Sequence, residues 1–209
     1  MLVIWDLDGT LVDSRADLAA SGNDARAALG LPPLAESVIA GFVGDGLGVL
    51  IQRLIPEGDP TVWAAARKAF ELSYADRCTQ RPVVYPGIIT VLERCAAAGW
   101  TQGVATNKAI AFTTPILRVA GLAQYFAAVV GGDGPRKPDP GQLQQIAAMT
   151  GADLTTGWMV GDHHTDLLAG KAAGCKTVFC TWGMGRRDGH PAHAVAQRPE
   201  DLPGCLGLP

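Results

Sequence analysis

Two carboxylates stand two positions apart near the start of the chain, directly after an apolar run. The run Leu2–Trp5 is typical of a buried strand, and it leads into Asp6-Leu7-Asp8-Gly9-Thr10. Two carboxylates at one strand end repel each other, and a bound Mg²⁺ would remove that conflict. Gly9 allows the backbone to turn closely around a ligand. The segment predicts metal-assisted carboxylate chemistry at a strand end, with an Asp-Gly turn between two strands as the alternative.

Polar residues also follow the next apolar runs that have the character of strands. These pairs of run and polar end are 103–105 with Thr106-Asn107, 127–130 with Gly131-Gly132-Asp133, and 158–160 with Gly161-Asp162. Because ligands bind outside the carboxyl ends of parallel strands, we expect these groups to meet at one site. Turn formation alone would also favour such residues, but it does not explain Lys137 in its Gly- and Pro-rich loop.

The apolar patterns divide the chain into two kinds of segment. From about Ser14 to Arg81 the spacing is helical throughout, with breaks at Gly41, in the Gly-rich loop around Gly44, and at Pro56. From residue 82 onward helical patterns alternate with short apolar runs, of which 177–180 is the last. Alternating strands and helices predict a parallel sheet.

Composition limits the classes of function. With 209 residues, 48% of them hydrophobic and 18% charged, the chain is long and apolar enough for a large packed core. A net charge of −3 argues against sequence-independent nucleic-acid binding but leaves phosphate-bearing small molecules open. No export signal or membrane-spanning stretch is found, and the five scattered cysteines favour reduced thiols in a cytoplasm. His190 and His193 form an H-x-x-H element, which we interpret as a polar loop and not as a zinc site.

Four segments in order resemble the signature motifs of the haloacid dehalogenase-like hydrolase superfamily. They are Asp6-Leu7-Asp8-Gly9-Thr10, Thr106-Asn107, Lys137-Pro138 and Gly161-Asp162-His163-His164-Thr165-Asp166, and the resemblance covers essentially the whole chain. It implies a doubly wound (Rossmann-like) α/β core with a parallel sheet, made of residues 1–13 and 82–209, and an inserted small helical cap at 14–81. The segments 27–32 and 41–47 resemble the phosphoglycolate phosphatase group.

The resemblance assigns a role to each motif residue. Asp6 would attack phosphorus and become an aspartyl phosphate, while Asp8 would protonate the leaving alkoxide and then deprotonate water. Mg²⁺ would be held by the Asp6 carboxylate, the Asp8 backbone carbonyl and Asp162, with Asp166 behind them. The other two motifs would bind the phosphoryl group and stabilise its transition state through Thr106, Asn107 and Lys137. The alternative for Lys137 is a surface lysine.

Substrate choice is expected in the cap, which would close over the site. Gly44 belongs to the loop that we expect to face the active site, and Arg53 is the nearest cationic residue able to pair with a substrate carboxylate. Arg53 could equally be a solvated helix residue. We interpret His163 and His164 as loop residues.

The sequence thus predicts a Mg²⁺-dependent phosphomonoesterase for 2-phosphoglycolate or a similar small phosphate ester. We expect a cytoplasmic monomer or homodimer with no nucleic-acid or membrane partner. The alternatives are a phosphatase for a sugar phosphate, nucleotide or pyrophosphate, or a phosphomutase that passes the phosphoryl group to a sugar. A binding module on an inactive scaffold is a different class, and the presence of all the motif residues argues against it.

Overall fold

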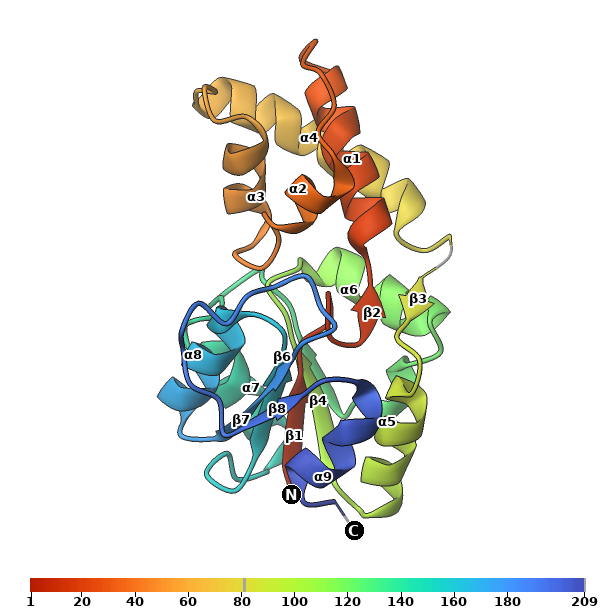
Figure 1. Ribbon diagram of the computed structural model, residues 1–209, viewed down its shortest axis with the longest axis vertical. Helices are drawn as coiled ribbons and strands as arrows, with labels where there is room; N and C mark the ends of the chain where they lie inside the picture. Colours follow the sequence, from red (N-terminus) through yellow and green to blue (C-terminus); the bar gives the residue numbers. More distant parts are fainter. Residues whose placement is uncertain (81, 209) are drawn as a thin grey trace.

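A six-stranded sheet with all neighbours parallel forms the centre of the protein (Figure 1). The computed structural model describes residues 1–80 and 82–208, so Arg81 at the end of the predicted cap and Pro209 at the end of the predicted core lie outside the described residues. In sheet order the strands are β5 (Ala128–Val130), β4 (Thr101–Ala105), β1 (Leu2–Trp5), β6 (Trp158–Gly161), β7 (Lys176–Cys180) and β8 (Ala194–Ala196). The chain extends the sheet from β1 first in one direction and then in the other, which confirms the doubly wound α/β fold.

Helices cover both faces of this sheet. One face packs against α5 (Ile88–Ala97), α6 (Ile110–Val119) and α9 (Leu202–Leu206), and the other against α7 (Gly141–Thr150) and α8 (His164–Ala173). Two 3₁₀ turns, η1 (Ala123–Tyr125) and η2 (Pro199–Asp201), complete the connections. None of the described helices is both long and apolar enough to cross a membrane.

The sequence of β1 explains its central position. Every residue of the strand is buried, and alternate side chains reach opposite faces. Val3 and Trp5 join the core under α5 and α6, whereas Leu2 and Ile4 join the core under α7 and α8. The indole Nε1 of Trp5 donates a hydrogen bond of 3.2 Å to Oε1 of Gln102, so the polar atom of this buried ring is satisfied.

Four further helices lie together beyond the carboxyl end of β1 (Figure 1). They are α1 (Arg15–Ala27), α2 (Glu36–Ala40), α3 (Leu47–Leu54) and α4 (Pro60–Arg77). The chain enters them through β2 (Val12–Asp13) and leaves through β3 (Val83–Val84), which pair as an antiparallel ribbon that the sequence did not predict. The ribbon lies at the boundaries expected between core and cap, and those boundaries stay a prediction.

Candidate active site

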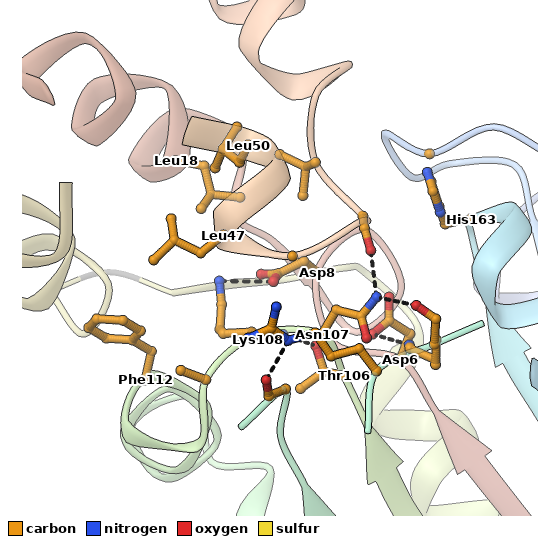
Figure 2. Close-up of a pocket in the computed structure, with 18 of the residues that line it drawn as sticks. Asp6, Asp8, Leu18, Leu47, Leu50, Thr106, Asn107, Lys108, Phe112 and His163 are labelled. Atoms are coloured by element: carbon orange, nitrogen blue, oxygen red, sulfur yellow. Dashed lines mark hydrogen bonds and ion pairs between the residues drawn. The ribbon is translucent and has the colours of Figure 1, made fainter. Parts of the chain in front are cut away.

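The polar strand ends meet at one edge of the sheet. Asp6, Thr106 and Asp162 directly follow β1, β4 and β6, and the Asp6 amide continues the sheet by donating to the Val160 carbonyl at 2.9 Å. These residues line one cavity, partly open to solvent, between the strand ends and the helices that precede residue 81. The same cavity is lined by Lys137 and Gly44. It is also lined by Asp8 and Asn107, which Figure 2 labels.

Lys137 is the positive centre of the site. Its side chain is 1% exposed, and Nζ lies 2.8 Å from Oδ1 of Asp6 and 2.6 Å from Oδ1 of Asp166. Nζ also donates to the Ala105 carbonyl at 2.7 Å. Burial alone would lower the pKa of Lys137, but the two carboxylates raise it, so the ammonium group stays charged. The structure therefore excludes a solvated surface lysine.

A compact carboxylate cluster surrounds this lysine. Asp6, Asp162 and Asp166 are buried, and one oxygen of each lies within 4.8 Å of the others. Burial raises the pKa values of Asp6 and Asp162 above the ordinary range, with Lys137 opposing the effect at Asp6 and the neighbouring carboxylates adding to it at both. Asp166 uses both of its oxygens, because Oδ1 contacts Lys137 and Oδ2 accepts from the His163 amide at 2.9 Å. An oxygen-only cluster with excess negative charge fits a hard divalent cation held by Asp6 and Asp162.

Asp162 is held in one orientation by backbone amides and a hydroxyl. Oδ1 accepts from Oγ1 of Thr10 at 3.0 Å, and Oδ2 accepts from the amides of Met184 and Gly185 at 3.0 and 2.8 Å. A Cβ on Gly183 would lie 2.2 Å from Oδ2, so this loop approaches closely only with glycine. The sequence did not predict the loop at 183–185 as part of the site.

Asp8 points away from the carboxylate cluster, toward a lysine that the sequence reading missed. Its Oδ2 lies 2.8 Å from Nζ of Lys108, and its Oδ1 accepts from Oγ of Ser14 at 2.6 Å. Nζ of Lys108 also donates to the hydroxyl of Tyr74 in α4 at 2.6 Å. Burial lowers the pKa of Lys108, but Asp8 and Tyr74 together raise it above its usual range. The signal in the sequence that could have indicated Lys108 as a site residue is its position directly after the motif residues Thr106 and Asn107.

The helices within 14–81 contribute a backbone loop and, together with Phe112 of α6, an apolar wall. Nδ2 of Asn107 donates to the Gly44 carbonyl at 2.8 Å and to the Lys137 carbonyl at 2.9 Å, which joins the cap loop to two motifs. On the side beyond Asp8 and Lys108 the cavity is apolar (Figure 2). This apolar wall consists of Leu18, Leu47, Leu50, Phe70 and Phe112.

The structure places Arg53 away from the cavity. Nη2 lies 2.7 Å from Oδ2 of Asp45, and Nη1 donates to the Phe42 carbonyl at 2.9 Å. Among the described residues that line the cavity, the arginines are Arg67 and Arg136. Nε of Arg136 donates to the Gly132 carbonyl at 2.6 Å, which fixes the stem of the side chain at the cavity edge. The sequence did not distinguish Arg136 from other loop arginines.

Comparisons with known proteins agree with this geometry. The sequence model of the haloacid dehalogenase-like hydrolase family matches residues 3–180. A phosphoglycolate phosphatase of Yersinia pseudotuberculosis is 34% identical over 217 residues, covering 99% of this chain and 93% of the relative. One of Neisseria meningitidis is 36% identical over 190 residues, with coverages of 88% and 81%.

A solved structure from Haemophilus somnus, described as a predicted phosphoglycolate phosphatase, superposes with a TM-score of 0.89 at 28% identity. The superposition covers 96% of this chain and 95% of the other. Motif order, fold and sequence similarity along nearly the full length lead to the same conclusion. The chain belongs to the haloacid dehalogenase-like hydrolase family.

Proposed function

We propose that this protein is a Mg²⁺-dependent phosphomonoesterase that acts on 2-phosphoglycolate or a similarly small phosphate ester. The observation that carries the proposal is that Asp6, Lys137 and Asp162 line one cavity with Asp8, while the buried Asp166 contacts Lys137 from behind. The relatives are named phosphoglycolate phosphatase, which supports 2-phosphoglycolate as the substrate. A cytoplasmic location and a monomeric or homodimeric state stay predictions.

In the proposed reaction, a carboxylate oxygen of Asp6 attacks phosphorus and forms an aspartyl phosphate. Asp8 pairs with Lys108 as a carboxylate in the structure, so it takes up a proton as substrate binds; it gives this proton to the departing alkoxide as the bond from phosphorus to the ester oxygen breaks. Asp8, now ionised, takes a proton from the water that hydrolyses the intermediate, so inorganic phosphate leaves and Asp6 is restored. Mg²⁺ held by Asp6, the Asp8 carbonyl and Asp162 would supply positive charge to the phosphoryl oxygens.

The remaining motif residues position the phosphoryl group in this proposal. Lys137 keeps Asp6 oriented and ionised and meets charge that develops on the phosphoryl oxygens. Thr106 and Asn107 lie at the end of β4, where the Thr106 hydroxyl and the Asn107 backbone N–H would donate hydrogen bonds to those oxygens. Asp166 acts through Lys137, because its contacts are to that side chain and to the His163 amide.

We propose that the helices within 14–81 act as the cap and that Arg136, not Arg53, meets the substrate carboxylate. Arg136 lines the cavity beside Gly46 of the cap loop, whereas Arg53 is paired with Asp45 outside it. The apolar wall favours a second candidate, a phosphatase for an ester with a larger apolar leaving group.

The test is the initial rate of phosphate release with Mg²⁺, using Asp6→Asn as the blank. The panel contains 2-phosphoglycolate, ethyl phosphate, hexyl phosphate, a sugar phosphate, a nucleotide and pyrophosphate. We expect 2-phosphoglycolate to have the highest kcat/KM. Preference for hexyl phosphate would favour the second candidate, and unchanged activity in the blank would refute the mechanism.

Two arginine variants then locate the carboxylate contact. Arg136→Ala should raise KM for 2-phosphoglycolate about 10-fold or more, the loss expected for a charge-assisted contact, while KM for ethyl phosphate changes little. Arg53→Ala is the matched arginine variant on the cap. If Arg53→Ala shows the selective effect and Arg136→Ala does not, the assignment to Arg136 is wrong.

A further inference from the structure

A cluster of two imidazoles and a carboxylate lies where the cap loop meets the core, outside the carboxylate cluster of the active site. The residues are Asp45, in the loop before α3, and His163 and His164, at the start of α8. One ring nitrogen of each histidine and one oxygen of Asp45 lie within 4.8 Å of one another. We propose that these three side chains bind a transition-metal ion of the Zn²⁺ type, which joins the cap loop to the core.

His163 presents a free ring nitrogen to the cap loop. Its Nδ1 accepts from the Thr165 amide at 3.4 Å and lies 3.0 Å from Oγ1 of Thr165, so Nδ1 is already used. The other nitrogen faces Gly44, where an added Cβ would lie only 2.6 Å from Nε2. A metal ion at Nε2 takes the place of the proton on that nitrogen, which is released to solvent. The contacts to Thr165 fix the ring orientation that a metal ligand needs.

His164 adds a nitrogen that has no hydrogen bond. Its Nδ1 is buried and finds no hydrogen-bond partner among the described residues. Asp188 is nearby, with Oδ2 at 3.2 Å, but the geometry is not that of a hydrogen bond. The rings of His163 and His164 lie with their centroids 4.2 Å apart, and His190 stacks on the outer side of His164 at 5.9 Å. A buried nitrogen that makes no hydrogen bond and has only the ionic contact with Asp188 is costly, and a bound ion would remove that cost.

The donor set separates this cluster from the active site. Two imidazoles with one carboxylate suit Zn²⁺ and related ions, whereas Mg²⁺ prefers oxygen ligands such as Asp6 and Asp162. Arg53 competes for Asp45 at 2.7 Å, but its side chain is 39% exposed. Exposed ion pairs stabilise a protein little, so Arg53 can release Asp45 when a metal ion binds.

The proposed ion has a functional consequence. Gly44 lines the active-site cavity and Asp45 follows it, so an ion bound to both Asp45 and α8 holds the cap loop against the core. Substrate entry and product release require the cap to move. Zn²⁺ should therefore slow turnover at saturating Mg²⁺. Only this kinetic consequence depends on the proposed phosphatase function, because metal binding is measured separately.

The experiment is a titration of the full chain with Co²⁺ and with Zn²⁺ in saturating Mg²⁺. Visible absorption reports nitrogen coordination of Co²⁺, and calorimetry counts the Zn²⁺ equivalents. We expect one equivalent that excess Mg²⁺ does not displace. Asp45→Asn and His164→Gln should each weaken its binding about 10-fold or more. Glu57→Gln, which changes an exposed carboxylate elsewhere in the cap, should leave it unchanged.

Three outcomes would overturn the proposal. If the wild-type protein binds no equivalent beyond the one that Mg²⁺ displaces, the ion belongs to the carboxylate cluster. Equal affinity in wild type and both variants would remove these residues from the site. Loss of affinity in Glu57→Gln as well would show a nonspecific charge effect. If His164→Gln does not fold, Asp45→Asn decides alone, because its side chain lies in a loop. Any of these results leaves the phosphatase test unaffected.

Discussion

The contact of Tyr74 with Lys108 allows a quantitative test of how the cap is held to the core. Tyr74→Phe removes one hydroxyl, whose oxygen accepts from Nζ of Lys108 at 2.6 Å. The ring keeps its packing on Phe70 and Phe112, with centroid distances of 5.6 and 5.3 Å, and stays 4.4 Å from the ammonium group. A hydrogen bond to a charged group contributes about 1.5–3 kcal/mol. Because Lys108 retains Asp8, we expect a loss near the lower end, about 1.5 kcal/mol.

Lys108→Met has a larger expected effect on the free energy of unfolding. It leaves Asp8, whose side chain is 11% exposed, without its cation. Removing one partner of a buried ion pair costs about 3–5 kcal/mol, and the remaining hydrogen bond from Ser14 favours the lower value. In the Lys108→Met background, Tyr74→Phe should cost little, since the donor is gone. The double-mutant cycle should therefore give a coupling energy of at least about 1 kcal/mol.

Urea denaturation of the wild type, both single variants and the double variant measures this cycle. The matched control is Tyr125→Phe, whose hydroxyl makes an exposed contact of 3.4 Å with Glu93 and should cost under about 0.5 kcal/mol. Additivity within about 0.5 kcal/mol would mean that the Tyr74–Lys108 contact does not hold the cap, and the reasoning would fail.

Three further predictions concern the carboxylate cluster. Lys137→Met should lower the free energy of unfolding by about 3–5 kcal/mol and abolish phosphate release, as urea denaturation and a phosphate assay would show. Gly183→Ala should raise the Mg²⁺ concentration for half-maximal activity about 10-fold by displacing Asp162, whereas Gly204→Ala, with open space around it, should not. Without metal, the raised pKa values of Asp6 and Asp162 mean that the folded state binds more protons than the unfolded state, so stability should fall as pH rises. The increase in Tm caused by Mg²⁺ should accordingly grow between about pH 5 and about pH 8, and a constant increase would contradict this assignment.

The motif residues of the core could be predicted because the fold itself collects them. Asp6, Thr106 and Asp162 each follow an apolar run, and a parallel sheet brings the ends of such runs to one edge. Two short elements left no comparable signal. The β2–β3 ribbon pairs two strands of two residues each, one before and one after the helices α1 to α4. Strand β8 is the three-residue segment Ala194–Ala196, which is too short to show an alternating pattern.

The cap side of the site depends on packing that the sequence pattern does not contain. Tyr74, near the carboxyl end of α4, reaches Lys108 although the two residues are 34 positions apart. Arg53 and Arg136 have the same side chain, and the sequence pattern does not show which of them lines the cavity. Arg53 turns toward Asp45 while the stem of Arg136 is fixed by the Gly132 carbonyl at the cavity edge. Tertiary contacts of a few ångströms therefore decide which of the two arginines lies at the cavity edge.

Two consecutive residues after β4 connect the helices of the proposed cap to the core. Asn107 donates to the Gly44 carbonyl of the cap loop and to the Lys137 carbonyl of the core. Lys108 contacts Tyr74 of the cap and Asp8 of the core. Movement of these helices away from the core would break one contact of each residue, while Asn107 keeps its contact with the Lys137 backbone and Lys108 keeps its contact with Asp8. If the helices within 14–81 move as the proposed cap, variants at Asn107 and Lys108 should change turnover and the motion of these helices together.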